Sequence, residues 1–317
     1  PDLEGRKAVL AVHARGTPLA PGGDLDVIAR RTPGFTGADL ANLMNEAALL
    51  AARHDLPLIG LPQLEEAIDR VMAGPERRSR LISEREKRVI AYHEGGHALV
   101  AHALPNTDPV HKISIIPRGR ALGYTLTLPT EDKFLVTRSE LVDELAMLLG
   151  GRTAEELIFA DPTTGAQNDI DRATTIARQM VTEFGMSDAL GPMRLGHPQG
   201  EIFLGRDLTT TPDYSDEIAA RIDAEVRALI DGAHAAARRV LTENRALLDR
   251  VAGELVERET LEAERVQELF RDARMFDGAG TDGTTAQPRG PEPAHVPGRS
   301  GAAAAQQSDS PHRGGTS

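Results

Sequence analysis

The sequence contains no cysteine and no tryptophan, and aromatic residues make up only 3% of its 317 residues. Without cysteine the chain has no disulfide, no thiol nucleophile and no cysteine-based zinc site, which is typical of a reducing compartment. A metal ion could therefore be bound only by His, Asp or Glu side chains. With so few aromatic residues, the hydrophobic core must consist mainly of Leu, Ile, Val and Ala.

Long hydrophobic runs and an excess of positive charge are also missing. No run of about 18 apolar residues and no charged-then-apolar leader occurs, so we expect neither a transmembrane helix nor a signal peptide in this chain. Lys and Arg total 36 against 48 Asp and Glu, a formal net charge of −12. This balance argues against nucleic acid as a partner, because phosphate binding needs a positive field. Because the chain begins with Pro1 instead of Met, we expect it to be the C-terminal part of a longer protein.

Residues 1–74 have the pattern of a small helical bundle. Apolar residues recur at helical spacing in four stretches, which are 3–14, 24–30, 36–54 and 64–72. In the third stretch, Thr36 and Asp39 have the spacing of a capping box, which predicts a helix start. Gly74-Pro75 is a stop signal, so we place the end of this unit at residue 74.

Residues 75–277 predict a second, larger unit that is mostly helical and contains one small sheet. Helical patterns cover 83–104, 137–149, 153–159, 168–184, 216–242 and 261–275, and β-type patterns cover 112–116 and 121–128. Ser83 with Glu86 and Thr137 with Glu140 have the spacing of capping boxes at the starts of the first two helices. The Gly150-Gly151 pair is expected to end the second of these helices. We therefore expect a fold that is mainly α with a small β-sheet, in which a helical bundle precedes a mostly helical domain.

Residues 278–317 consist mainly of Gly, Pro, Ser, Thr, Ala and Gln. Such a segment cannot bury enough apolar surface to offset the entropy that is lost on ordering. We expect it to be a disordered tail.

The strongest chemical signal is His93-Glu94-Gly95-Gly96-His97, within the helical pattern 83–104. On a helix, two histidines four residues apart project from the same face and can bind one Zn²⁺. Zinc lowers the pKa of a bound water to about 7, and Glu94 can then accept the proton of that water. This is the chemistry by which a metalloprotease attacks a peptide carbonyl.

The alternative is a helix that carries two surface histidines. Two observations argue against it. The flanking residues are apolar, which indicates burial; they include Ile90, Ala91, Ala98, Leu99 and Val100. Gly95 and Gly96 each cost about 1 kcal/mol relative to Ala inside a helix, and this cost is unexplained unless another element approaches closely.

A zinc protease needs a third protein ligand, and spacing alone leaves its identity open. The extended motif with Gly and His after the second histidine is absent, since Val100 and Ala103 occupy those positions. Asp108 is the only acid between His97 and Glu131, and its Asn-Thr-Asp-Pro context favours a turn. The remaining candidates are Glu155, Glu156, Asp161, Asp169 and Asp171.

Several segments together resemble a known family. YHEGGHALVAHAL, DPVHKISIIPRGRALGYTLTLP, LLGGRTAEELIF and TTGAQNDIDRATTIARQMVTEFGMS resemble the peptidase domain of the FtsH family of membrane-anchored AAA metalloproteases. PDLEGRKAVLAVHARGTPLAP and DLDVIARRTPGFTGADLANLMNEAALLAAR are similar to the helical lid that ends the AAA ATPase module of that family. The segments follow one another in the family's order.

The resemblance implies a ligand set and a catalytic base. His93 and His97 would bind Zn²⁺, and Asp169 in the GAQNDI segment would be the third ligand. Glu94 would be the catalytic base. From the residues alone, Asp169 could equally be a plain helix cap.

Three further features belong to this comparison. Glu155 and Glu156 follow a Gly-Gly-Arg turn and either orient a ligating histidine or form an exposed helical pair. The strand 121–128 is either an edge, along which an extended substrate pairs, or an internal strand. Gly95 stands where the family usually has Ala, and we expect little effect of this difference.

A phosphate-binding P-loop is missing, because none of the Lys residues follows a Gly. The resemblance therefore implies that the complete protein binds ATP and Mg²⁺ mainly through a core outside this chain. His13 and the backbone of Gly37 and Ala38 would contribute contacts to the adenine from the lid.

The favoured interpretation is the peptidase and lid part of an ATP-dependent zinc metalloendopeptidase that cleaves unfolded or membrane-protein substrates. The resemblance implies a homo-hexamer at the cytoplasmic face of the plasma (bacterial inner) membrane, with its anchor upstream of this chain. One alternative is a non-catalytic hexamer-assembly module built on the helices of residues 216–275, and another is a stand-alone soluble zinc peptidase. The intact HEGGH motif argues against the first, and the attached lid argues against the second.

Overall fold

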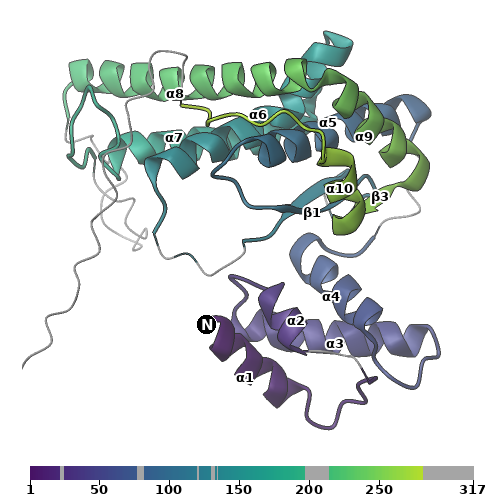
Figure 1. Ribbon diagram of the computed structural model, residues 1–317. Helices are drawn as coiled ribbons and strands as arrows, with labels where there is room; N and C mark the ends of the chain where they lie inside the picture. The colour runs from purple at the N-terminus through teal and green to yellow at the C-terminus, as the bar shows by residue number, and fades with distance from the viewer. Residues whose placement is uncertain are drawn as a thin grey trace, which may run out of the picture. The chain divides into compact units, whose positions relative to one another are not determined.

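The computed structural model describes residues 1–21, 25–76, 82–119, 121–129, 133, 135–196 and 214–280. These residues form ten α-helices, one short 3₁₀ helix and three β-strands (Figure 1), so the predicted mainly α fold with a small sheet is confirmed. Within the same residues, none of the helices combines the length and the apolar character that crossing a membrane requires.

The first four helices form a bundle around a hydrophobic core of their own. They are α1 (Leu3–His13), α2 (Leu25–Arg30), α3 (Gly37–Arg53) and α4 (Leu61–Ala73). Helix α3 begins at the predicted capping box, because the Thr36 hydroxyl accepts a hydrogen bond from the Asp39 amide and the Asp39 carboxylate accepts one from the Thr36 amide. Leu10, Leu40 and Leu64 are fully buried in the bundle core.

The remaining elements build a second, larger core. Its helices are α5 (Glu84–Ala103), α6 (Arg138–Phe159), α7 (Gln167–Thr182), α8 (Asp216–Glu243), α9 (Arg245–Arg258) and α10 (Ala263–Phe270), and the 3₁₀ helix η1 (Thr164–Ala166) precedes α7. Figure 1 shows α8 as a long green helix that lies along α6 and α7, and these helices pack against one another.

Helix α5, which carries the HEGGH motif, lies at the centre of this second core. It begins at the predicted capping box of Ser83 and Glu86. From Ile90 to Leu104, every residue except His102 is buried. Helices α6 and α9 and the small sheet pack around it. The prediction that the motif helix is buried is therefore confirmed.

Helix α6 is continuous through Gly150 and Gly151, so the prediction that this pair ends a helix is wrong. Gly150 lies where α6 crosses α5. A Cβ atom at Gly150 would lie 2.9 Å from the Gly96 carbonyl oxygen, and one at Gly96 would lie 2.6 Å from the Gly150 carbonyl oxygen. These glycines let two helix backbones approach closely, which also explains the presence of Gly96 inside α5.

The sheet consists of three antiparallel strands in the order β2-β1-β3, which are β1 (Val110–Ser114), β2 (Tyr124–Thr127) and β3 (Thr260–Glu262). Within the described residues β2 pairs only with β1, so the strand predicted over 121–128 is an edge strand. The helix predicted for 261–275 is wrong at both ends, because residues 260–262 pair with β1 instead and α10 ends at Phe270. A three-residue strand is too short to show a periodicity, and its pairing partner decides its conformation.

The tail predicted over 278–317 lies, from residue 281 onward, outside the described residues. Its first part contacts α6. Ala279 is buried, and its amide donates a hydrogen bond to the buried Asp143 carboxylate at 2.6 Å. Asp143 also accepts hydrogen bonds from the Asn106 amide and side chain, so it links the turn after α5 to residue 279.

Candidate metal centre

Three side chains from two helices converge beside the crossing of α5 and α6. His93 and His97 lie one turn apart on α5, and their Nε2 atoms are 3.0 Å apart. Asp169 projects from the first turn of α7, with Oδ2 at 3.4 Å from His93 Nε2 and 3.5 Å from His97 Nε2. In the part of the chain that the structure describes, this is the one cluster of at least three His, Asp or Glu side chains that could share a metal ion.

The second ring nitrogen of each histidine contacts an acceptor. His93 Nδ1 lies 2.7 Å from Glu155 Oε1, and His97 Nδ1 lies 2.8 Å from the Met147 carbonyl oxygen. Because a carboxylate and a carbonyl oxygen can only accept hydrogen bonds, each Nδ1 carries a proton and is the hydrogen-bond donor. When a ring is neutral, it therefore presents the lone pair of Nε2 toward Asp169. Three electron-rich atoms at this separation repel one another unless a cation or a proton lies among them.

The charges around the cluster strongly favour a cation. Burial acts to lower the pKa of His93, but the Asp169 and Glu155 carboxylates that it hydrogen-bonds raise this pKa to about 10. Burial acts to raise the pKa of Asp169, but hydrogen bonds to His93 and His97 hold it well below its usual range. A proton bound here would therefore compete with a metal ion for the same lone pairs.

The geometry and the chemistry of the cluster both fit Zn²⁺. Zinc bonds of about 2.0–2.1 Å in a tetrahedral site place neighbouring ligand atoms roughly 3.3 Å apart. The three separations of 3.0, 3.4 and 3.5 Å agree with that value. Two imidazoles and one carboxylate are also a donor set that leaves a fourth position for water, as catalytic zinc sites do.

Gly151 of α6 leaves space beside the cluster. A Cβ atom at this position would lie 2.5 Å from His97 Nε2 and 2.6 Å from His93 Nε2. Any side chain larger than that of glycine would clash with the Nε2 atoms of both histidines. The glycine pair of α6 therefore has two uses, since Gly150 allows the helix crossing and Gly151 clears the candidate metal site.

Glu94 follows His93 on α5, and its carboxylate is buried against the sheet. Thr125 of β2 donates a hydrogen bond to Glu94 Oε2 at 2.9 Å. Gly123 lies against the other oxygen, because a Cβ atom there would be 2.7 Å from Oε1. Burial raises the pKa of Glu94 above its usual range, although the neighbouring histidines act to lower it. A carboxylate whose pKa is moved toward neutrality is suited to accept and return a proton.

The other carboxylates that the sequence suggested as ligands lie elsewhere. Glu156 faces away from the cluster and pairs with His234 at 2.9 Å. Asp161 and Asp171 are exposed. Of the two glutamates after the Gly-Gly-Arg segment, Glu155 is the one that contacts a candidate ligand.

Sequence reasoning missed four contributors to this site. The Met147 carbonyl could not have been found, because a backbone acceptor has no residue-type signal. Gly151 was visible but was interpreted as a helix stop. Thr125 and Gly123 lie in the GYT part of the second strand, and only the packing of that strand on α5 brings them to Glu94.

The residues predicted to contact adenine lie in the four-helix bundle. His13 is the last residue of α1, and Gly37 and Ala38 begin α3. All three are exposed. Their contact with adenine stays a prediction.

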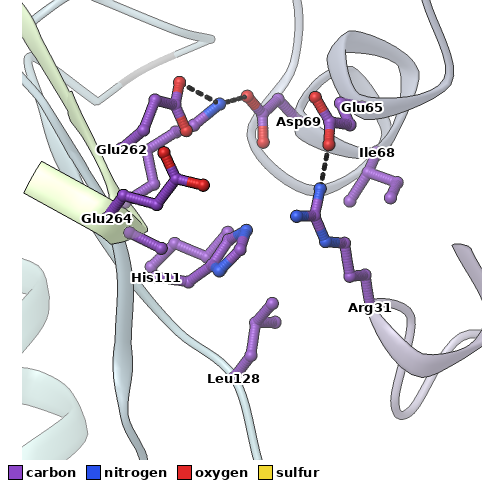
Figure 2. Close-up of a pocket in the computed structure, with 11 residues that line it drawn as sticks. Arg31, Glu65, Ile68, Asp69, His111, Leu128, Glu262 and Glu264 are labelled. Carbon is purple, nitrogen blue, oxygen red and sulfur yellow. Dashed lines mark hydrogen bonds and ion pairs between the residues drawn. The ribbon is translucent and has the colours of Figure 1, made fainter. Parts of the chain in front are cut away.

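A cavity of about 300 Å³ lies between Arg31, which follows α2, helix α4 and the sheet. Five of its charged side chains form ion pairs: Arg31 pairs with Glu65, and Lys112 Nζ lies 2.9 Å from Asp69 and 3.1 Å from Glu262. Figure 2 shows Asp69 and Glu262 directed at the same nitrogen from two sides. Because Lys112 of β1 pairs with both Asp69 of α4 and Glu262 of β3, we interpret these ion pairs as structural contacts between helix α4 and the sheet.

A buried helix that carries HExxH, with its histidines facing a carboxylate from a second helix, defines the class of metallopeptidases. Fused to that domain is a four-helix bundle with its own core. The chain belongs to peptidase family M41, whose model matches residues 80–269. The model of the AAA+ lid domain matches residues 23–66, within the bundle.

The chain is similar to proteins named ATP-dependent zinc metalloprotease FtsH. It is 57% identical to the one from Rubrobacter xylanophilus over 272 residues, which cover 86% of this chain and 42% of the relative. For FtsH 1 of a Thermoanaerobacter species, identity is 58%, with 85% of this chain and 44% of the relative covered. It is 54% identical to FtsH of Mycobacterium tuberculosis, with 88% of this chain and 38% of the relative covered. The resemblance to the FtsH family is confirmed, and the chain spans about two fifths of the length of these relatives.

Proposed function

We propose that this chain is the peptidase and lid part of an ATP-dependent zinc metalloendopeptidase that hydrolyses peptide bonds of unfolded or membrane-protein substrates. The observation that carries the proposal is the approach of His93, His97 and Asp169 to within 3.5 Å of one another, beside the buried Glu94. The family match and the name of the relatives, ATP-dependent zinc metalloprotease, support it.

In this proposal His93 and His97 bind Zn²⁺ through Nε2, and Asp169 binds it through a carboxylate oxygen. The zinc supplies Lewis acidity, which makes water acidic enough to lose a proton near neutral pH. Glu155 and the Met147 carbonyl hold the two imidazoles in the tautomer that leaves Nε2 free.

Glu94 is the general base of the proposed reaction. The Thr125 hydroxyl donates a hydrogen bond to Glu94 Oε2, whereas Glu94 Oε1 accepts no hydrogen bond from the described residues. Oε1 is therefore the atom that takes a proton from water as the peptide carbonyl is attacked. The same oxygen then returns the proton to the nitrogen of the leaving amine.

Among the described residues, β2 has one edge without a partner strand, and this edge supports a mode of substrate binding. An extended peptide can add to an exposed strand edge through backbone hydrogen bonds, without requiring a particular sequence. Because Thr125 of this strand contacts Glu94, a peptide paired with β2 would pass close to the base. This mode suits a protease that acts on unfolded segments.

For the complete protein, we propose a homo-hexamer that uses ATP and Mg²⁺ to unfold protein substrates and deliver them to the peptidase domains. Its phosphate-binding site and its membrane anchor would lie outside this chain. His13, Gly37 and Ala38 would contact the adenine from the lid. The protein would act at the cytoplasmic face of the plasma (bacterial inner) membrane, without a nucleic-acid partner.

The test compares two variants in the complete protein, with zinc content and casein cleavage as the measurements. Glu94→Gln keeps stoichiometric zinc and loses cleavage, because the amide cannot accept the proton. Asp169→Asn loses zinc affinity and cleavage together, because it removes the anionic ligand.

Three outcomes would overturn parts of this proposal. A wild-type protein without stoichiometric zinc at neutral pH would contradict the metal site. Cleavage by Glu94→Gln would contradict the role of the base. Zinc affinity unchanged in Asp169→Asn would place the third ligand elsewhere.

A further inference from the structure

Among the described residues, Thr125 is the one whose side chain donates a hydrogen bond to the Glu94 carboxylate. Its Oγ1 atom lies 2.9 Å from Glu94 Oε2 and 3.1 Å from the main-chain oxygen of Glu94. A hydroxyl has a single proton to donate, and a hydrogen bond to a carboxylate is stronger than one to a neutral carbonyl. The proton is therefore directed at Oε2.

The surroundings of Thr125 keep its hydroxyl in place. It lies within β2, opposite Ile113 of β1, which is fully buried. Two residues earlier on the same side of the extended chain, Gly123 fits so closely that a Cβ atom would lie 2.7 Å from Glu94 Oε1 and 2.8 Å from the Ser114 carbonyl oxygen. One short segment thus contacts both oxygens of the carboxylate.

We propose that Thr125 is a positioning residue, whose hydroxyl holds Oε2 of Glu94 so that Oε1 faces the reacting water. This inference rests on the proposed function, in which Glu94 is the general base. A glutamate side chain rotates about three bonds, and its carboxylate must stay within hydrogen-bond reach of the water. Misplacement of a reacting group by about 1 Å can cost on the order of 100-fold in rate.

Three substitutions distinguish the effect of the Thr125 hydroxyl from the effect of its side-chain shape. Thr125→Val keeps the branched shape and removes the donor. Thr125→Ser removes a methyl group and keeps the donor, so it should rescue what Thr125→Val loses. Thr127→Val is the matched control, because Thr127 lies two residues further along β2 and no side-chain hydrogen bond of it occurs among the described residues.

The first measurement needs no catalysis. The infrared difference spectrum between the chain with Glu94 and the chain with Glu94→Gln isolates the carboxyl stretching band of Glu94. We expect Thr125→Val to shift this band and Thr125→Ser and Thr127→Val to leave it in place. Zinc content should be the same in all three variants, because no candidate zinc ligand is changed.

The second measurement is casein cleavage by the complete protein with zinc and ATP. Thr125→Val should lower kcat about 10- to 100-fold, the size expected when a hydrogen bond to a charged group is lost, and should leave KM unchanged. The kcat of Thr125→Ser and of Thr127→Val should stay within about threefold of the wild-type value. Both variants keep a hydroxyl group at position 125.

The outcomes distinguish this inference from the function on which it rests. If wild-type protein cleaves casein, Glu94→Gln does not, and Thr125→Val matches the wild type in kcat and in the infrared band, the positioning role is wrong and the proposed function stands. If Glu94→Gln still cleaves casein, the proposed function fails first. If Thr127→Val lowered kcat as much as Thr125→Val does, the loss would come from placing valine in β2. That result would also overturn the specific role of Thr125.

Discussion

At the scale of single residues, the tautomer of each imidazole decides whether the cluster can hold a metal ion. A neutral histidine offers one lone pair, and Nε2 presents it to the centre only if Nδ1 keeps the proton. Glu155, which is 1% exposed, accepts a hydrogen bond from the protonated Nδ1 of His93. It also accepts a hydrogen bond from the Thr163 amide, so both carboxylate oxygens are used. Its buried charge is therefore fully hydrogen-bonded.

We predict that Glu155→Gln lowers zinc affinity about 10- to 100-fold, the usual effect of removing a partner that orients a ligating histidine. The amide that replaces one oxygen cannot accept a hydrogen bond, so either His93 or Thr163 loses its acceptor. Competition with a zinc-binding dye measures the affinity.

Glu156→Gln is the control for this prediction, because Glu156 pairs with Arg152 and His234 outside the cluster. Its zinc affinity should equal that of the wild type. Equal affinities of all three proteins would show that Glu155 does not orient His93.

At the scale of elements, the crossing of α5 and α6 brings the helix with the two candidate histidine ligands against the helix that supplies Glu155 and the Met147 carbonyl. Gly96 and Gly150 allow this contact, since each would place a Cβ atom within 3.0 Å of the other's backbone. The neighbouring Gly95 differs, because a Cβ atom there would lie 3.4 Å from side-chain atoms of Leu248 and Val251, an ordinary contact. Of these two adjacent glycines, Gly96 thus has no room for a side chain, whereas Gly95 has room for a methyl group.

We predict opposite effects for alanine at these adjacent positions. Gly96→Ala should destabilise the chain by about 1–3 kcal/mol, because the added methyl group meets a backbone that cannot move aside easily. Gly95→Ala should be neutral or stabilise the chain by up to about 1 kcal/mol, because alanine favours the helix. Chemical denaturation followed by circular dichroism measures both, and equal effects of the two substitutions would contradict this account of the crossing.

The elements that the sequence predicted well are those with a local signal. The capping boxes at Thr36, Ser83 and Thr137 each begin a helix, since the residues that satisfy the first amides lie three positions apart. The elements that it missed depend on a distant partner. Residues 260–262 form a strand because β1 lies beside them, and α6 continues through its glycine pair because α5 packs there.

At the scale of the whole molecule, the described residues form two hydrophobic cores. One lies among helices α1–α4 and the other among the elements from α5 onward. All three candidate ligands belong to elements of the second core. Metal binding should therefore stabilise the second core and leave the stability of the first unchanged.

We predict that removing zinc with a chelator increases hydrogen exchange in α5, α6 and α7 and leaves the exchange in α3 and α4 unchanged. A ligand present at about 1,000 times its Kd stabilises the state that binds it by about 4 kcal/mol, and chelation removes that contribution. Hydrogen exchange followed by mass spectrometry on the full chain resolves the two regions. Equal loss of protection in both regions, or none in α5–α7, would contradict the prediction.

The spacing of residues along the chain was enough to predict the mainly α fold, the helix that carries HEGGH and the two histidines on one face of it, because these features depend on spacings within individual helices. The absence of cysteine also limited any metal site to His, Asp and Glu. Which carboxylates approach the histidines depends on how the helices pack, because Glu155, Asp169 and the Met147 carbonyl reach them from α6 and α7. The same holds for Thr125, whose hydroxyl meets Glu94 because an edge strand packs on α5. Contacts between elements far apart in the chain depend on packing, and a local pattern cannot encode them.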